Sequence, residues 1–177
     1  LTEYSPVYSR HEKTAEFVYG IPSKIYELDK EDIKILKELS TNARISIIEL
    51  AEKIGLTRDI INYRIKKLTK EGVIIQYRCF LNLHNISINL YKLIIRTKNF
   101  GKDFEDKLKL YIRNKKEASQ MLKLIGSWDL ELEFEVENED ELYKILNEIR
   151  KEFSAIIRDF DILRITRTFK LEYFPFS

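Results

Sequence analysis

A row of side chains that can bind nucleic acid lies within residues 56–72, LTRDIINYRIKKLTKEG. Asn62, Tyr63, Lys66 and Lys70 recur at helical spacing on one arc of this segment. An asparagine amide can pair with adenine through two hydrogen bonds, and lysine ammonium groups bind phosphate. Most charged rows on surface helices are only hydrated, so the surrounding sequence must decide between these two interpretations. The opposite arc is apolar and contains Ile61, Ile65 and Leu68.

The sequence has too few cysteine and histidine residues for a disulfide or a Cys/His metal site. Cys79 is the only cysteine, and His11 and His84 are the only histidines. We therefore expect no internal disulfide, no Cys/His metal cluster and no cofactor. No apolar run approaches the roughly 18 residues of a membrane helix, and the start of the chain has no signal-peptide pattern. These features predict a cytoplasmic protein without a membrane partner. Leu1 stands in place of an initiator methionine, which indicates a processed chain or part of a longer one.

The charge is concentrated in the same part of the chain as the polar row. The net charge of all 177 residues is only +2, yet residues 57–78 hold six basic side chains and two acidic ones. With 44% hydrophobic and 34% charged residues, the chain is typical of a soluble globular protein. A local basic excess on a nearly neutral protein is a weak indication of a polyanionic partner.

Three short helices are predicted to position the polar row. The first begins at Asp29, and the second has Ser46 and Glu49 as a capping box. The third follows Thr57 and ends before Gly72. Because only GLT separates the second helix from the third, these two form a helix-turn-helix. The expected core residues of the first two helices are Ile33, Leu36, Leu39, Ile47, Leu50, Ala51 and Ile54.

The remainder predicts an α+β fold, a winged helix-turn-helix followed by a ferredoxin-like βαββαβ domain. We expect a wing strand in VIIQYRCFLNL, residues 73–83, and a domain boundary in the polar segment 84–89. The later strands are expected at 88–98, 118–125, 129–137 and within 156–174, with helices at 103–115 and 139–153. The domains are then an arm or linker at 1–27, a winged helix-turn-helix at 28–83 and a ferredoxin-like domain at 84–177.

The order of these elements resembles that of the leucine-responsive/asparagine-synthesis (Lrp/AsnC) family of transcription regulators. The similarity is strongest in LDKEDIKIL (28–36), NARISIIELAEKIGLT (42–57) and YRIKKLTKEGVI (63–74), and it extends to about residue 173. In the second half, GSWD (126–129) stands where this family has G-x-x-D in its amino-acid-sensing, or RAM-type, domain. The resemblance implies a sequence-specific regulator that binds double-stranded DNA.

A recognition helix enters the major groove with its N-terminus first. We therefore divide the basic and amide side chains into those expected near base edges and those expected near phosphates. Arg58, Asn62, Tyr63 and Lys66 are nearest the base edges, although Tyr63 could equally pack against the first helix. Asp59 more simply offsets the helix dipole. The complete predicted DNA-binding set is Arg44, Thr57, Arg58, Asn62, Tyr63, Arg64, Lys66, Lys67, Lys70 and Arg78. Within this set Arg44, Arg64, Lys67, Lys70 and Arg78 are expected on phosphates.

The GSWD segment has two interpretations. In the first it is a tight turn, because Gly126 allows a positive φ and Asp129 bonds to the turn backbone. In the second Gly126, Ser127 and Asp129 form a small-effector site for the charged groups of an amino acid.

Charges alternate on two strands that should be neighbours in the ferredoxin-like sheet. Glu131, Glu133 and Glu135 lie on one, and Lys92 and Arg96 lie on the other, so we expect pairs across the strands. This face is either simply hydrated or an interface selective for a complementary partner. The resemblance implies a homodimer or higher oligomer, or a pseudo-dimer if a homologous half precedes Leu1.

One enzyme alternative stays open at this point. Siroheme decarboxylases resemble Lrp/AsnC proteins in overall plan, but the sequence contains no cluster of potential catalytic groups. The basic row on the third helix favours the regulator, for which no catalytic residue and no metal ligand is expected.

Overall fold

The computed structural model describes residues 2–3, 17–18, 25–170 and 174–175. The chain divides into two compact units, and the division falls between Phe80 and Leu81, slightly before the expected boundary. Two short strands near the start, β1 (Thr2–Glu3) and β2 (Phe17–Val18), belong to the second unit. Most of the arm expected at 1–27 lies outside the described residues.

The first unit contains α1 (Lys30–Thr41), α2 (Ile47–Ile54) and α3 (Arg58–Lys70), and each begins at the predicted N-cap. The reciprocal capping box occurs at α1, where Asp29 and Asp32 cap each other's backbone. At α2 the Ser46 hydroxyl accepts from the Glu49 amide, but the Glu49 side chain does not accept from the Ser46 amide in return. Glu49 instead lies 3.8 Å from the Lys53 ammonium group. The predicted box at α2 is therefore only half formed.

The core of the helical unit differs from the prediction on α1. Ile35 is completely buried, whereas Ile33, Leu36 and Leu39 are only partly buried. The buried stripe of α1 is therefore displaced, because Asp32 also turns inward and is 3% exposed. The other fully buried residues of this unit are Leu50, Ile61 and Leu68.

The predicted wing strand at 73–83 does not form in the described part of the chain. The amides of Val73 and Ile74 both donate to the Leu68 carbonyl, which ties the start of this segment to the end of α3. Beyond it the chain is irregular, and Ile75 and Tyr77 are exposed. Strand propensity alone does not produce a strand, because a ladder needs a partner strand for its backbone groups.

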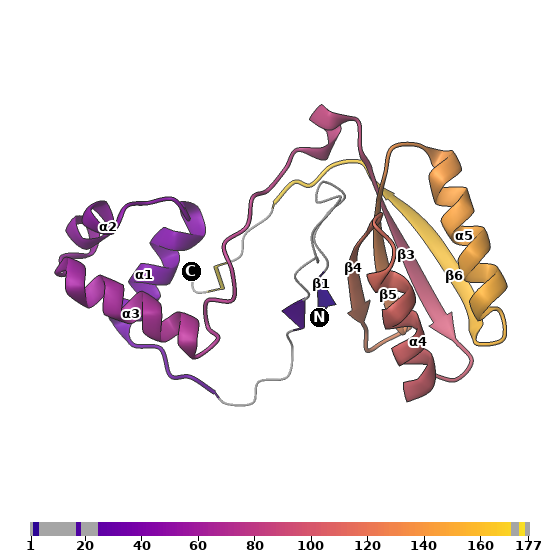
Figure 1. The fold of residues 1–177 in the computed structure, drawn as a ribbon, viewed down its shortest axis with the longest axis horizontal. Helices are drawn as coiled ribbons and strands as arrows, with labels where there is room; N and C mark the ends of the chain where they lie inside the picture. Colours follow the sequence, from indigo (N-terminus) through magenta and orange to yellow (C-terminus); the bar gives the residue numbers. More distant parts are fainter. Residues whose placement is uncertain (1, 4–16, 19–24, 171–173, 176–177) are drawn as a thin grey trace. The chain divides into compact units, whose positions relative to one another are not determined.

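The second unit has the predicted βαββαβ order (Figure 1). A 3-10 turn, Leu83–Ile86, precedes it and overlaps the expected boundary segment. The elements are β3 (Asn89–Thr97), α4 (Lys102–Arg113), β4 (Ala118–Lys123), β5 (Leu130–Val136), α5 (Glu139–Phe153) and β6 (Ile157–Ile165). Neighbouring strands are antiparallel in the order β4-β5-β3-β6, and β1 and β2 extend the sheet beyond β4.

Alternation along the central strands separates a buried face from a polar one. Leu93 and Ile95 of β3 and Leu132 and Phe134 of β5 are at most 1% exposed. Both helices pack into this same core, through residues that include Leu108, Ile112, Leu142, Ile145 and Ile149. The opposite face of the sheet carries the alternating charges, so the fold class that the sequence predicts is confirmed.

Candidate nucleic-acid interface

The polar side chains of α3 face solvent because the apolar side chains on its other arc are buried. Ile61 and Leu68 are completely buried, and this fixes which arc of the helix faces outward. Asn62 and Lys66 are exposed on that outward arc, and Arg58 is exposed in the first turn. Tyr63 is 67% exposed, so the alternative in which it packs against α1 is wrong.

A hollow lies between the start of α2 and the start of α3. Its volume is about 440 Å³. Its walls combine apolar, amide and charged side chains, namely Ile47, Ile48, Thr57, Arg58, Asp59 and Asn62. Thr57 is also the N-cap of α3, since its hydroxyl accepts from the Ile60 amide at 3.4 Å. Its hydroxyl therefore has a structural role besides the DNA contact that we predicted.

Arg64 has a different environment from the other basic residues of α3. Its guanidinium donates to Asp29 at 2.6 Å and to Asp32 at 2.8 Å, and so joins α3 to the start of α1. The hydrogen bond from Arg64 holds the pKa of Asp29 below its ordinary value, and the two carboxylates raise the pKa of Arg64. Both hydrogen bonds use Nη1, so Arg64 has a structural role besides the phosphate contact that we predicted.

Lys67 lies beside an aromatic ring and remains exposed. Its ammonium group is 5.3 Å from the centre of the Tyr26 ring, and a hydrogen bond to Tyr26 raises the pKa of Lys67. Lys70 is exposed in the last turn of α3. Arg44 before α2 and Arg78 beyond α3 are also exposed.

In the second unit, the GSWD segment forms the turn between β4 and β5. Gly126 has a φ of 151°, a region that favours glycine. Asp129 accepts from the amide of Thr97 at 2.6 Å and from its hydroxyl at 2.8 Å, so it bonds to β3 rather than to its own turn. These hydrogen bonds lower the pKa of Asp129. Ser127 contributes its carbonyl, which accepts from Arg96 at 2.8 Å.

The charged face of the sheet contains one of the two predicted sets of pairs. Lys92 lies 2.5 Å from Glu131 and 3.6 Å from Glu133, as the neighbouring strands predict. Burial alone would lower the pKa of Lys92, but the two carboxylates outweigh it and the pKa is raised. Glu135 is only 8% exposed.

The expected pairing of Arg96 with the glutamates is wrong. The Arg96 guanidinium stacks 4.6 Å from the centre of the Trp128 ring and lies 3.8 Å from Asp159 on β6. β3 has a neighbour on each side, and Asp159 is directly opposite Arg96 in the register with β6.

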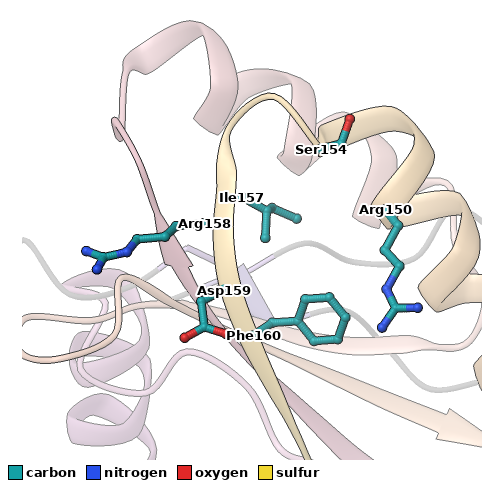
Figure 2. Close-up of a pocket in the computed structure, with 6 residues that line it drawn as sticks. All are labelled: Arg150, Ser154, Ile157, Arg158, Asp159 and Phe160. Atoms are coloured by element: carbon teal, nitrogen blue, oxygen red, sulfur yellow. The ribbon is translucent and has the colours of Figure 1, made fainter.

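A second hollow, of about 380 Å³, lies where α5 leads into β6, and no sequence pattern predicts it. Figure 2 shows Arg150 and Phe160 on one side of β6, and Arg158 and Asp159 on the other. The Arg150 guanidinium lies 5.0 Å from the centre of the Phe160 ring. Within the described ranges, no group of three or more His, Cys, Asp or Glu side chains could hold a metal ion. No helix in these ranges is long and apolar enough to cross a membrane.

Comparisons with known proteins agree with the helix-turn-helix unit and with the ferredoxin-like unit. Residues 28–75 match the family model described as winged helix-turn-helix DNA-binding. The chain is 35% identical over 120 residues to the leucine-responsive regulatory protein of Haemophilus influenzae, which covers 67% of this chain and 72% of that protein. It is 29% identical over 140 residues to an uncharacterized HTH-type transcriptional regulator of Pyrococcus furiosus, covering 73% of this chain and 87% of that one.

Solved structures share the fold at lower identity. AsnC of E. coli is 21% identical with a TM-score of 0.69, and the match covers 84% of this chain and 98% of that one. A transcriptional regulator from Neisseria meningitidis, solved as a complex with L-Met, is 22% identical with a TM-score of 0.72, covering 82% and 94%.

A helix-turn-helix unit followed by a ferredoxin-like unit defines a class of DNA-binding transcription regulators. The chain belongs to the Lrp/AsnC family of these regulators. The relatives described above include no protein named as an enzyme, so the siroheme decarboxylase alternative gains no support.

The bridge from Arg64 to α1 predicts a stability effect with a defined pH dependence. Replacing Arg64 with Met leaves the buried Asp32 carboxylate without its cation, so we expect unfolding to cost about 1–3 kcal/mol less at pH 7. In the parent chain, the contribution of Asp29 is complete above about pH 3.9 and is lost as pH falls through its lowered folded pKa. The variant should show a shallower loss of stability over that acid range.

Urea unfolding followed by circular dichroism at several pH values measures both effects. Lys66→Met is the matched control, because Lys66 is exposed on the same helix and should leave stability nearly unchanged. Equal stabilities for Arg64→Met and Lys66→Met would show that the bridge does not stabilise the helical unit.

Proposed function

We propose that this regulator inserts α3 into the major groove and reads bases with Arg58 and Asn62. Tyr63 and Lys66 follow on the same arc, while Arg44, Lys67, Lys70 and Arg78 bind phosphates. Thr57 holds the start of the helix against the DNA through its capping role. The protein would act in the cytoplasm, where duplex DNA is available to it.

The observation that carries this proposal is the contrast between Arg64 and the exposed lysines on the same helix. Arg64 is 23% exposed and is neutralised by carboxylates, whereas Lys66 and Lys70 are exposed and form no ion pair with an acidic side chain among the described residues. The positive charges of Lys66 and Lys70 are therefore available to a phosphate backbone. The basic row therefore favours a polyanion over hydration alone.

We expect duplex DNA binding with two separable components. Asn62→Ala should relax base preference at one position, at a cost of about 1–3 kcal/mol for the preferred base. Lys70→Ala should weaken binding to all sequences about equally and reduce the slope of log K against log salt by about 0.9. Selection from a random DNA pool, followed by fluorescence anisotropy over a range of salt concentrations, measures both. Binding that is insensitive to salt, or no binding to any duplex, would contradict the proposal.

We also propose a small-effector site at Gly126, Ser127 and Asp129. Both hydrogen bonds from Thr97 fall on Oδ2 of Asp129, so Oδ1 is the atom that would meet an ammonium group. The regulator from Neisseria meningitidis, whose structure contains L-Met, supports an amino acid as the ligand class.

Calorimetric titration with L-methionine and the other amino acids tests this effector site. We expect saturable binding of at least one amino acid, and weaker binding by Gly126→Ala, which places a side chain at a strained φ. Fluorescence of Trp128, the only tryptophan, provides the control for folding of this unit. If no amino acid binds, the only role of Asp129 is to hold the turn to β3.

For assembly, we propose that the charged sheet face of Lys92, Arg96, Glu131, Glu133 and Glu135 is an interface. It would join two copies in a homodimer or in a higher oligomer, or this chain and a homologous preceding half in a pseudo-dimer. Two DNA-binding units read two half-sites, which a single recognition helix cannot do. Lys92, Glu131 and Glu133 are partly buried, and the cost of desolvating such ion pairs offsets most of their attraction, so their main effect would be on the choice of partner.

We expect Glu133→Lys to lower association sharply while leaving the fold of the monomer nearly unchanged. The new ammonium group would face Lys92 and leave like charges in the interface, and Lys92→Glu in the same chain should restore part of the association. Sedimentation measures association, and circular dichroism controls for folding. Glu152→Lys, which changes an exposed charge on α5, should have no effect. Undiminished association of Glu133→Lys would mean that this face is only hydrated.

A further inference from the structure

Ile48 is an apolar side chain that the core of the helical unit does not use. It is 53% exposed, whereas its neighbour Ile47 packs against the buried cluster. Ile48 lines the hollow between the starts of α2 and α3, together with the polar residues of α3. Burial within this unit therefore does not explain an isoleucine at this position.

The polar residues of the hollow indicate what an apolar group could contact there. Asn62, which shares the hollow with Ile48, has the amide that pairs with adenine in the major groove. Every adenine is paired with thymine, and the C5-methyl group of thymine projects into the same groove. An apolar side chain is the group that distinguishes this methyl from the hydrogen atom that cytosine carries.

We propose that the hollow reads a thymine, and that Ile48 contacts its C5-methyl group within one base-pair step of the base that Asn62 contacts. The inference rests on the proposed function, because it requires α3 to lie in the major groove. It makes Ile48 a specificity-determining residue on α2, outside the recognition helix. Thr57, which also lines the hollow, has a methyl group besides the hydroxyl that caps α3.

Two other arrangements use the same residues and make different predictions. In one, Ile48 touches only deoxyribose, and the base beside it does not matter. In the other, the Asp59 carboxylate accepts from the amino group of cytosine, and the hollow prefers cytosine. Replacing thymine by uracil removes only the methyl group and keeps every hydrogen-bonding atom, so it separates these arrangements from the proposed one.

The experiment uses the tightest-binding duplex that the full chain selects from a random pool. Each thymine of this duplex is replaced by uracil in turn, and each variant duplex is titrated with the parent chain. We expect binding to weaken about fourfold at one or two thymines, the effect of exposing one buried methyl group. Ile48→Ser should bind the thymine and uracil versions equally at those positions, and Ile48→Val should retain the difference.

Ile75→Ser is the matched control, because Ile75 is 49% exposed in the same unit but lies outside the hollow. This variant should keep the full difference between thymine and uracil. If selection gives sequence preference but no thymine responds to uracil, or the response persists in Ile48→Ser, the inference is overturned while the proposed function stands. If selection gives no preferred sequence, the proposed function fails first.

Discussion

The orientation of α3 depends on one buried carboxylate. Asp32 is 3% exposed, and an ionised carboxylate so far from water needs a cation and hydrogen bonds to be tolerated. Arg64 supplies both, and the same guanidinium reaches Asp29, whose side chain caps α1. Rotation of α3 about its axis would break these contacts and also withdraw Ile61 and Leu68 from the core. The face that α3 presents outward is therefore fixed by charge and by apolar burial together.

The second unit uses polar contacts in the same way at its β4–β5 turn. Asp129 receives two hydrogen bonds from Thr97, and its own amide donates to the Ile95 carbonyl. The turn is thereby held to the end of β3 by three hydrogen bonds. Arg96 adds a contact to the Ser127 carbonyl and a stacked contact to Trp128. If the proposed effector site exists, a turn held in this way would give it a preformed surface, which reduces the ordering cost of binding.

Sequence patterns predicted the elements well where a local signal exists. The N-caps Asp29, Ser46 and Thr57 each form because a side-chain oxygen reaches a backbone amide three residues later. The alternation of β5 likewise predicts its buried apolar residues, although Glu135 is buried with them. Long-range partners were not predictable in this manner. Nothing local to Arg64 indicates a carboxylate 32 residues away, and nothing local to Arg96 indicates whether it pairs with β5 or β6.

The same limit applies to the basic excess that first indicated a nucleic-acid partner. Residues 57–78 contain six basic and two acidic side chains, but a count along the sequence treats every cation as available. Arg64 is neutralised by Asp29 and Asp32, which both lie outside that segment. Lys67 keeps its charge beside Tyr26, because an aromatic face stabilises a cation without neutralising it. The positive electrostatic field at a phosphate backbone would consequently be weaker than the number of basic side chains suggests. It would be concentrated on the outward arc of α3, whose direction the buried Asp32 fixes.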